Sequence, residues 1–585
     1  MNPTSRHRRS LEGSRASSRG HAAWSWLLLL AACGFGDLPP VGPENLCSDD
    51  DACGADRCDA DEGRCVSTRN DAVEIVIEVV PPTDLSDVPL PSWSTEPEVV
   101  DGSLTRALRQ PTYVDLVGTI RWGGRRVPAE LVFTRPLDGR ADSRLRVSTL
   151  SEPTLVGDEP VDFRARLGTG RVYDLEIRPT AAPRDEDGMP WSRVLPPIRV
   201  RNVETPMASP LNPTNYVWPI AIEYPSDLET PCQGERSRAC TLEGTVVSLV
   251  SELEQNESGV QVQAIEVESG AVVSSTAVTG EDGEFSLTIA PDAERYVLRV
   301  TGGTGRPLFP TVTIDPALLS GAQVRVRVPS PRRVSYRATV ESANGDSLSG
   351  AVLTFTSNDV FDVDSGLGGS FRTTAETNAS GDVVVELLAG SYDVVVTPSQ
   401  PNLAVASVSG LTIQPPPTGG VLQGQLFVAP ERARVGGVVR TPSGAEVTDL
   451  NLEAVALGTR LEEQVSLFNR SAEAPLDDEG RFELRLDRGA YDLYLRPPPE
   501  SGFPWVVVPD RAIGAVDTTL ADRFDLEAPR RLDGEVTTPE GAPLANAEVR
   551  VHGRMPGTTR FVEIGRARTD ETGAYLVWLP ARLGR

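Results

Sequence analysis

The stretch that decides the fold is residues 478–496, DEGRFELRLDRGAYDLYLR. A turn at Gly480 is followed by alternating apolar and polar residues, and a second glycine, Gly489, leads through Tyr491 into another short apolar stretch. Alternation with a period of two predicts strands that bury one face. The turn glycine supplies the positive φ that a tight hairpin needs. This stretch therefore predicts two strands of a β-sandwich.

The same pattern recurs along the chain at intervals of a little under 100 residues, which predicts tandem domains. The related turns contain Gly283, Gly381, Gly480 and Gly573. The strand at 489–495 has a close copy at 390–396 and a weaker one at 296–300, and the opening strand and turn at 437–444 recur at 534–541. An earlier, more divergent copy opens at Gly118 and closes with residues 173–179. The chain therefore holds about five units.

A unit of roughly 95 residues suits a seven-strand sandwich, because each one-faced sheet must be covered by a second sheet. The predicted fold class is all-β, with tandem immunoglobulin-like or transthyretin-like sandwiches. We expect a signal peptide at 1–32, a tether at 33–45, a disulfide module at 46–66, a divergent sandwich with linkers at 72–230, and repeats at 241–330, 333–430, 433–528 and 531–585. The last repeat ends before its closing strand. We expect either an edge that accepts a strand from another chain or a marginal domain.

The repeated motifs resemble the carboxypeptidase regulatory-like domain, a transthyretin-like sandwich. They comprise a G-x-V strand, an A-x-V-x-V strand, a T-x-x-x-G-x-F/Y turn and a closing G-x-Y strand, in one register from about Leu242 to the end and more weakly over 113–200. The resemblance implies a mostly non-catalytic module of envelope and secreted proteins, sometimes found beside carbohydrate-binding machinery. The zinc site of the peptidase that gave the family its name cannot be built, because His552 is the only histidine beyond residue 32.

The amino terminus has the pattern of a secretory signal. Five arginines precede an apolar run from Ala22 to Ala32, which is too short to span a hydrocarbon core of about 30 Å. The junction Leu30-Ala31-Ala32-Cys33-Gly34 resembles the lipobox of bacterial lipoproteins, which implies acylation of Cys33 and anchoring in the membrane through lipid such as palmitate. Gly rather than Asp at position 34 implies sorting to the cell outer membrane, on its periplasmic or its outer face. The alternative is an ordinary signal with a free Cys33.

Six further cysteines suit disulfides in an oxidising compartment, namely Cys47, Cys53, Cys58, Cys65, Cys232 and Cys240. The first four lie in a stretch with almost no apolar side chain, which must be cross-linked to fold. Their connectivity stays open, although pairing of Cys47 with Cys58 and of Cys53 with Cys65 would give a compact module. Cys232 and Cys240 close a short loop. No C-x-x-C occurs to favour zinc, and the acids between them match no calcium loop.

The net charge of -27 repels phosphate backbones and excludes nucleic acid as an expected partner. The chain has no lysine, so it offers no amine for a Schiff base. We expect no catalytic, cofactor-binding or metal-binding residues and no cofactor. The acidic turns around Asp282, Asp477, Asp478 and Asp570 are read as structural, and His552 as a strand-end residue.

The leading functional hypothesis is a non-enzymatic envelope lipoprotein that presents sandwiches for binding a protein or polysaccharide or for a structural or adhesive role. Segments 354–375, with Phe355, Phe361 and Phe371, and 456–476 are candidate binding insertions. The first alternative is carbohydrate binding, for which the aromatic candidates are Trp122, Trp191, Trp218, Trp505 and Trp578. The second is a hydrolase that uses two carboxylates, although no pair is singled out.

Overall fold

The computed structural model describes residues 46–583 apart from several internal segments. These are 48–55, 60–62, 69–70, 83–89, 138–139, 151–153, 157–158, 162, 185–193, 208–215, 225–239, 251–252, 291–294, 304, 316–323, 363–364, 418–419, 441–452, 459–471, 478, 515–516 and 520–523. The regular structure of the described residues consists of strands and one short 3-10 helix, Pro499–Ser501. The all-β fold class is therefore confirmed. No helix in the described parts is long and apolar enough to cross a membrane.

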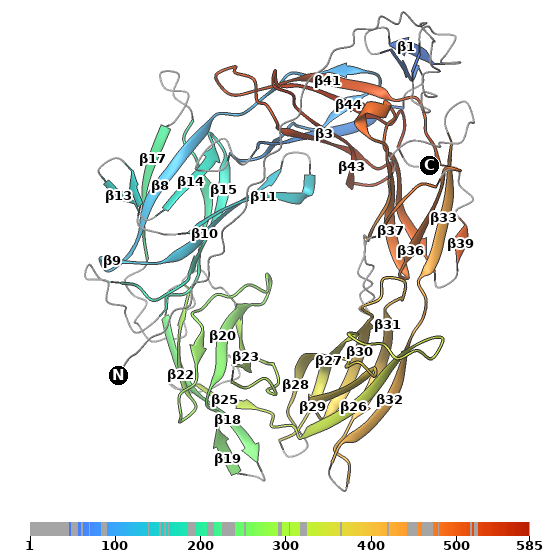
Figure 1. Cartoon of the computed structure of the whole chain (residues 1–585). Helices are drawn as coiled ribbons and strands as arrows, with labels where there is room; N and C mark the ends of the chain where they lie inside the picture. Colours follow the sequence, from blue (N-terminus) through green and yellow to red (C-terminus); the bar gives the residue numbers. More distant parts are fainter. Residues whose placement is uncertain are drawn as a thin grey trace, which may run out of the picture. The chain divides into compact units, whose positions relative to one another are not determined.

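Sandwich 3, residues 333–429, shows the plan that the other units share (Figure 1). Its first strand pairs antiparallel with the strand after the glycine turn and parallel with the last strand. The second sheet is built around a hairpin and the closing G-x-Y strand. The strand order is β29-β26-β32 in one sheet and β28-β27-β30-β31 in the other. The strands are β26 (Arg333–Ser342), β27 (Val352–Phe361), β28 (Gly368–Glu376), β29 (Asp382–Leu388), β30 (Gly390–Thr397), β31 (Ala406–Ile413) and β32 (Leu422–Ala429).

Three other contiguous units repeat this plan. Sandwich 1 (residues 113–224) contains β8 (Tyr113–Trp122), β9 (Arg125–Arg126), β10 (Ala129–Leu137), β11 (Arg140–Leu150), β12 (Thr154–Val156), β13 (Glu159–Val161), β14 (Phe163–Gly168), β15 (Val172–Pro179), β16 (Ile198–Glu204) and β17 (Tyr216–Glu223). Sandwich 2 (residues 240–328) contains β18 (Cys240–Val250), β19 (Leu253–Asn256), β20 (Val260–Glu266), β21 (Ala277–Val278), β22 (Glu284–Ile289), β23 (Tyr296–Gly302), β24 (Val312–Ile314) and β25 (Val324–Val328). Sandwich 4 (residues 433–526) contains β33 (Ala433–Arg440), β34 (Glu453–Gly458), β35 (Ala472–Pro475), β36 (Arg481–Leu486), β37 (Gly489–Arg496), β38 (Val506–Ile513), β39 (Thr518–Thr519) and β40 (Phe524–Asp525).

Strands with clear alternation bury the face that the alternation predicts. In β25, VRVRV, the valines are buried and the arginines exposed. In sandwich 3 the inward side chains include Phe355 and Phe371, which meet the ring of Tyr392 edge to face. Aromatic pairs of this geometry add about 0.5–1.5 kcal/mol beyond burial of their area. The alternation thus selects one core-facing set per sheet.

In four of the units a glycine turn comes directly before the strand that pairs antiparallel with the opening strand. Its glycine has the positive φ that the sequence predicts. Gly283, Gly381, Gly480 and Gly573 have φ of 73°, 73°, 69° and 79°. Asp570 Oδ1 accepts hydrogen bonds from the backbone N–H of Thr572 and Ala574, at 2.8 and 2.9 Å. The pKa of Asp570 is lowered mainly by the Thr572 hydroxyl and also by these N–H groups. This acidic turn is structural, and the Asp477 carboxylate makes the same bonds in sandwich 4.

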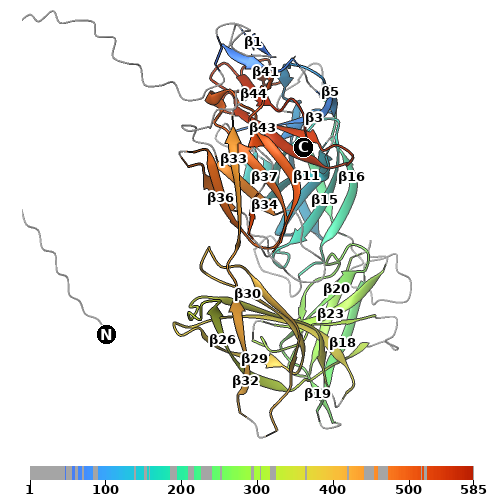
Figure 2. The ribbon, with the colours of Figure 1, turned by 90° about the vertical axis from the view of Figure 1, so that its right-hand side faces the viewer.

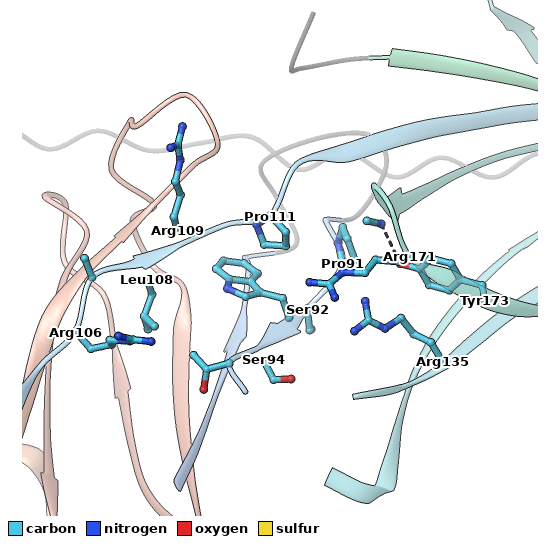
Figure 3. A pocket seen from close by; sticks show the side chains of 14 residues that line it. Pro91, Ser92, Ser94, Arg106, Leu108, Arg109, Pro111, Arg135, Arg171 and Tyr173 are labelled. Atoms are coloured by element: carbon cyan, nitrogen blue, oxygen red, sulfur yellow. Dashed lines mark hydrogen bonds between the residues drawn. The ribbon is translucent and has the colours of Figure 1, made fainter. Parts of the chain in front are cut away.

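The tyrosine of the closing G-x-Y strand fixes that strand to the chain just before it. The Tyr491 hydroxyl donates to the Asp487 carbonyl at 3.0 Å, and the Tyr392 hydroxyl donates to the Leu388 carbonyl at 2.8 Å. In sandwich 1 the Tyr173 hydroxyl accepts from the Gly168 N–H at 2.9 Å (Figure 3). All three side chains are at most 1% exposed. A buried tyrosine whose hydroxyl bonds to nearby backbone is a recurrent device of sandwiches.

The first and last parts of the described chain share one further sandwich, which we call the composite sandwich. It consists of residues 73–109 and 530–583, and Figures 1 and 2 both show the blue amino-terminal strands among the red carboxy-terminal ones. Its strands are β3 (Val73–Val80), β4 (Trp93–Ser94), β5 (Glu98–Val100), β6 (Leu104–Thr105), β7 (Leu108–Arg109), β41 (Arg530–Thr537), β42 (Glu548–Arg554), β43 (Phe561–Arg568) and β44 (Ala574–Leu579). The predicted boundaries were wrong here, because 73–109 does not belong to sandwich 1.

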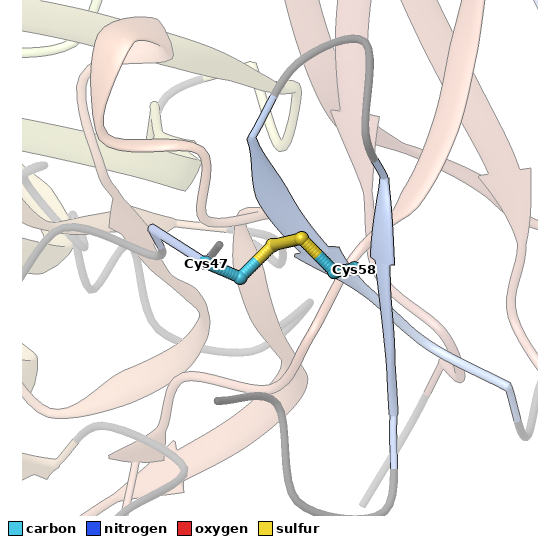
Figure 4. Close-up of a disulfide and its surroundings, with 2 residues drawn as sticks. All are labelled: Cys47 and Cys58. Atoms are coloured by element: carbon cyan, nitrogen blue, oxygen red, sulfur yellow. A yellow bond between two sulfur atoms is a disulfide. The ribbon is translucent and has the colours of Figure 1, made fainter. Parts of the chain in front are cut away.

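A small module precedes the composite sandwich. Strands β1 (Arg57–Asp59) and β2 (Arg64–Val66) form a hairpin, and a disulfide joins Cys47 to Cys58 (Figure 4). Cys65 and Cys240 are also disulfide-bonded. Cys53 and Cys232 lie outside the described residues, as does Cys33. The Cys47–Cys58 bond is one of the pairings that the sequence left open.

Candidate functional site: the sandwich shared by both ends of the chain

The amino-terminal segment provides strands to both sheets of the composite sandwich. Strand β3 runs antiparallel to β42, from Ile75 opposite Gly553 to Val80 opposite Glu548. In the other sheet β6 and β7 run parallel to β41. Strand β3 thus takes the position of the closing strand β37 of sandwich 4, and β6 and β7 take the positions of its last strands β39 and β40. The segment 73–109 therefore supplies the second half of a repeat whose first half is 530–583.

This arrangement corrects the expectation for the last repeat. The sequence predicted a missing closing strand and therefore an edge for another chain or a marginal domain. The edge of β42 is instead covered by β3 of the same chain. The expectation was wrong because the missing strand precedes the first repeat in the sequence.

One hydrophobic core includes side chains of both segments. Ile75, Ile77 and Val79 of β3 are at most 1% exposed and belong to one cluster with side chains of β41, β42 and β44. Burying such a side chain contributes about 1.5–3 kcal/mol, as an upper estimate. Neither segment can bury its apolar face without the other.

Arg530 ties the two segments together through backbone carbonyls. Its guanidinium donates to the carbonyls of Asp71 and Val100, at 2.7 and 2.8 Å, and to those of Pro580, at 2.9 Å, and Ala581. Arg530 is 2% exposed. Burial lowers the pKa of Arg530, and the charges of Asp71 and Asp101 act in the opposite direction. The side chain uses its planar set of donors to hold two chain ends at once.

Two pairs on the other face of β3 and β42 also bridge the segments. Glu78 Oε2 lies 3.1 Å from His552 Nε2, with the side chains 11% and 6% exposed. Glu74 Oε2 accepts from Arg554 Nη1 at 2.7 Å in a more exposed position. His552 lies near the end of its strand, as the sequence predicted, but its partner comes from the opposite end of the chain.

The glycine of the G-x-V motif is required by close backbone approach. A Cβ on Gly534 would lie 2.0 Å from the Arg106 carbonyl oxygen of the amino-terminal segment. A Cβ on Gly118 or Gly244 would lie 2.5 or 2.2 Å from the carbonyl oxygen of the parallel last strand. The same position of the repeat is therefore crowded in the same way, whether the last strand follows in sequence or comes from residues 104–109.

The aromatic candidates for ligand binding lie mainly in cores. Trp122 and Trp578 are each 5% exposed, and Trp218 packs against the core of sandwich 1. Trp505 meets Tyr494 edge to face at 6.3 Å and lies beneath the guanidinium of Arg496. Trp191 lies outside the described residues. The four described side chains therefore form no platform of exposed rings.

The candidate insertion at 354–375 is mostly a hairpin of β27 and β28, not a binding loop. Phe355 and Phe371 are core residues, at 0% and 4% exposed, while Phe361 at the end of β27 is 46% exposed. Of the other candidate, 456–476, residues 459–471 lie outside the described chain. The lengths of these two segments in the sequence could not distinguish a long hairpin from a loop.

Two buried carboxylates of the other sandwiches, Asp115 and Asp487, are held in ion pairs. Asp115 Oδ1 accepts from Arg166 Nε at 2.7 Å, and Asp115 Oδ2 accepts from Arg164. Burial raises the pKa of Asp115, but the hydrogen bonds from these arginines outweigh it, so the pKa lies below its ordinary value. Asp487 pairs with Arg432 at 2.7 Å in sandwich 4. These carboxylates serve as structural acceptors.

The described residues bring together no group of three or more metal-ligating side chains. A cavity of about 230 Å³ beside Pro111 includes Arg106, Arg109, Arg135 and Arg171 in its lining (Figure 3). No carboxylate or histidine occurs among its lining residues, so it offers no acid and base pair for hydrolysis.

No family model matches the sequence, and no curated protein is similar to it. Solved structures with partial likeness include a streptococcal ancillary pilin, at 11% identity over 49% of this chain and 99% of that chain, with a TM-score of 0.18. The Bacillus anthracis TIE protein is 9% identical over 77% of this chain and 74% of its own, with a TM-score of 0.15. The shaft pilin SpaA of Lactobacillus rhamnosus GG is 10% identical over 33% of this chain and 98% of its own, with a TM-score of 0.15.

Proposed function

We propose that this protein is a non-enzymatic lipoprotein of the cell envelope, whose sandwiches form a structural or adhesive scaffold. The observation that carries the proposal is the composite sandwich, which joins residues 73–109 and 530–583 in one domain. Three of its buried polar side chains, Arg530, Glu78 and His552, join the two segments. The resemblance of Cys33 to an acylated cysteine supports the anchor.

A polysaccharide ligand is less well supported than a protein partner or a purely structural role. The four described tryptophans that motivated it, Trp122, Trp218, Trp505 and Trp578, are in cores or packed against other side chains. A carboxylate-dependent hydrolase has no support from the buried acids, because Asp115 and Asp487 are paired with arginines. The scaffold role uses these pairs for stability.

The anchor is tested by expressing the full chain in a Gram-negative host and measuring the intact mass of the membrane-extracted protein. We expect a chain that begins at Cys33 and carries acyl groups, and we expect Cys33→Ala to abolish both the cleavage and the lipid. Gly34→Ala is the matched control, since it leaves the cysteine in place. Recovery of unmodified protein beginning at another residue would overturn the lipoprotein assignment.

A further inference from the structure

We propose that the composite sandwich also closes between copies of this chain. Residues 73–109 of one copy would complete residues 530–583 of a second copy, through the contacts seen within one chain. The interaction surface is the half-sandwich of β41 to β44, and its partner is the amino-terminal segment of another copy. Because donor and acceptor surfaces differ, such exchange joins copies head to tail, as a closed ring or an open filament.

The two halves of this sandwich, unlike those of the other sandwiches, are not directly connected in sequence. In sandwich 3 successive strands are connected through residues 333–429. In the composite sandwich no connecting loop joins 73–109 directly to 530–583, and sandwiches 1 to 4 lie between them in sequence. The halves are held by strand pairing, the shared core and Arg530. The same contacts are available to the same segment of a second copy.

The connection from the donor segment to sandwich 1 is very short. The Gln110 N–H donates to the Thr537 carbonyl at 2.8 Å, and the Thr169 N–H donates to the Thr112 carbonyl at 3.0 Å. Only Pro111 lies between these two anchored residues (Figure 3). Short, constrained hinges favour domain swapping, because the hinge gains freedom when the segment leaves its own chain.

Pairing of the two segments within one chain requires that the connections between sandwiches bring them together. Pairing between two chains does not have this requirement. Several connections are also short, at 329–332, 430–432 and 527–529, whereas the connection 225–239 has more residues. For one chain to close, these connections must return residue 530 to the segment where sandwich 1 began. The contact energy is the same in both forms. The balance is therefore set by the cost of loop closure and by local protein concentration.

The acceptor is selective for its own chain. Arg530 reaches carbonyls on both sides of β3, at Asp71 and Val100, and His552 and Arg554 meet Glu78 and Glu74. The closing strand of sandwich 4 has Tyr491 opposite Gly458, whereas β3 has Ile75 opposite Gly553. A closing strand from another repeat would bring a tyrosine where the composite core holds isoleucine. This difference favours residues 73–109 of a second copy as the partner.

The test uses two full-length variants, both carrying Cys33→Ala to remove the lipid and the thiol at that position, and both handled in detergent. One carries Glu74→Cys and the other carries Arg554→Cys, at facing positions of β3 and β42. The two are unfolded, mixed, refolded together over a range of concentrations and treated with a short bismaleimide. A cross-linked peptide containing positions 74 and 554 can then come only from two different copies. We expect this peptide to form, with a yield that rises with protein concentration during refolding.

The matched control is a mixture of Arg337→Cys and Val384→Cys copies, whose positions face each other within sandwich 3. We expect several-fold less linkage between these copies. Insertion of Gly-Ser residues after Pro111 should lower the 74 to 554 linkage between copies, because it eases closure within one chain. A double variant with Glu74→Cys and Arg554→Cys in one chain reports linkage within that chain. If the double variant forms the linked peptide but the mixture of single variants does not, the proposal is overturned. Failure of the double variant as well overturns the composite sandwich itself. Neither outcome depends on the lipid anchor.

Discussion

Arg530 shows how one side chain can decide whether two distant segments form a domain. It follows Pro529 at the start of β41, and its guanidinium lies between carbonyls of residues 71 and 100 and carbonyls of residues 580 and 581. Nothing in the local sequence distinguishes it from Arg531, which has only 19% of its side chain exposed and lies near Asp59. The role of Arg530 depends on contacts more than 400 positions away and could not be read from local pattern.

Replacing Arg530 with methionine should selectively destabilise the composite sandwich. Methionine keeps much of the volume but removes the guanidinium that donates to the carbonyls of Val100 and Pro580, whereas the Ala581 carbonyl still accepts from the Asp71 N–H. We expect a loss of about 1–3 kcal/mol and faster amide exchange in β3 and β42, with β27 of sandwich 3 unchanged as an internal reference. Arg481→Met, at a side chain that is 61% exposed, is the control. Equal protection of β3 in the Arg530→Met chain and the unaltered chain would contradict this role.

The strands show which parts of the repeat can be recognised from sequence. The glycine turn, the G-x-V strand and the G-x-Y strand were predicted because each meets a local or repeated requirement, such as the positive φ of Gly480. Strand β3 was not recognised as a closing strand because Ile75 stands where Tyr491 stands in sandwich 4. Its Val79-Val80-Pro81-Pro82 ending, comparable to Leu495-Arg496-Pro497-Pro498, was the signal that could have found it.

Gly534→Ala should loosen the pairing of β41 with β6 and β7. The added methyl group would meet the Arg106 carbonyl oxygen, and relief of such overpacking costs about 1–3 kcal/mol. We expect a lower thermal midpoint for the composite sandwich and greater proteolysis between residues 104 and 109. Gly514→Ala, where a Cβ would meet nothing within 4 Å, should have little effect. A Gly534→Ala chain as stable as the Gly514→Ala chain would rule out the close approach.

For the whole molecule, the pairing of β3 with β42 means that sandwiches 1 to 4 are connected to the composite sandwich at both ends. The cores of the separate sandwiches could be predicted from the alternation of residues such as those of β25. The pairing of residues 73–109 with residues 530–583 could not be predicted, because it depends on a contact between two half-repeats that are far apart in the sequence.

A single cut between sandwiches should therefore leave the protein as one particle. With a protease site inserted in 329–332, we expect the cut chain to elute unchanged in native size-exclusion chromatography and to separate only in denaturant. A second site in 430–432 should release sandwich 3. In the Arg530→Met background, one cut should suffice to separate the two fragments. Separation of the unaltered chain after one cut would show that its ends are not joined.

The position of residues 73–109 along the chain has a mechanical consequence. They lie between the disulfide module and sandwich 1, so tension applied across these two parts pulls directly on the strands that complete the composite sandwich. We therefore expect that sandwich to open before sandwiches 1 to 4, with the chain lengthening by roughly 3.3–3.6 Å for each residue released. We expect the strands to pair again when the tension is removed.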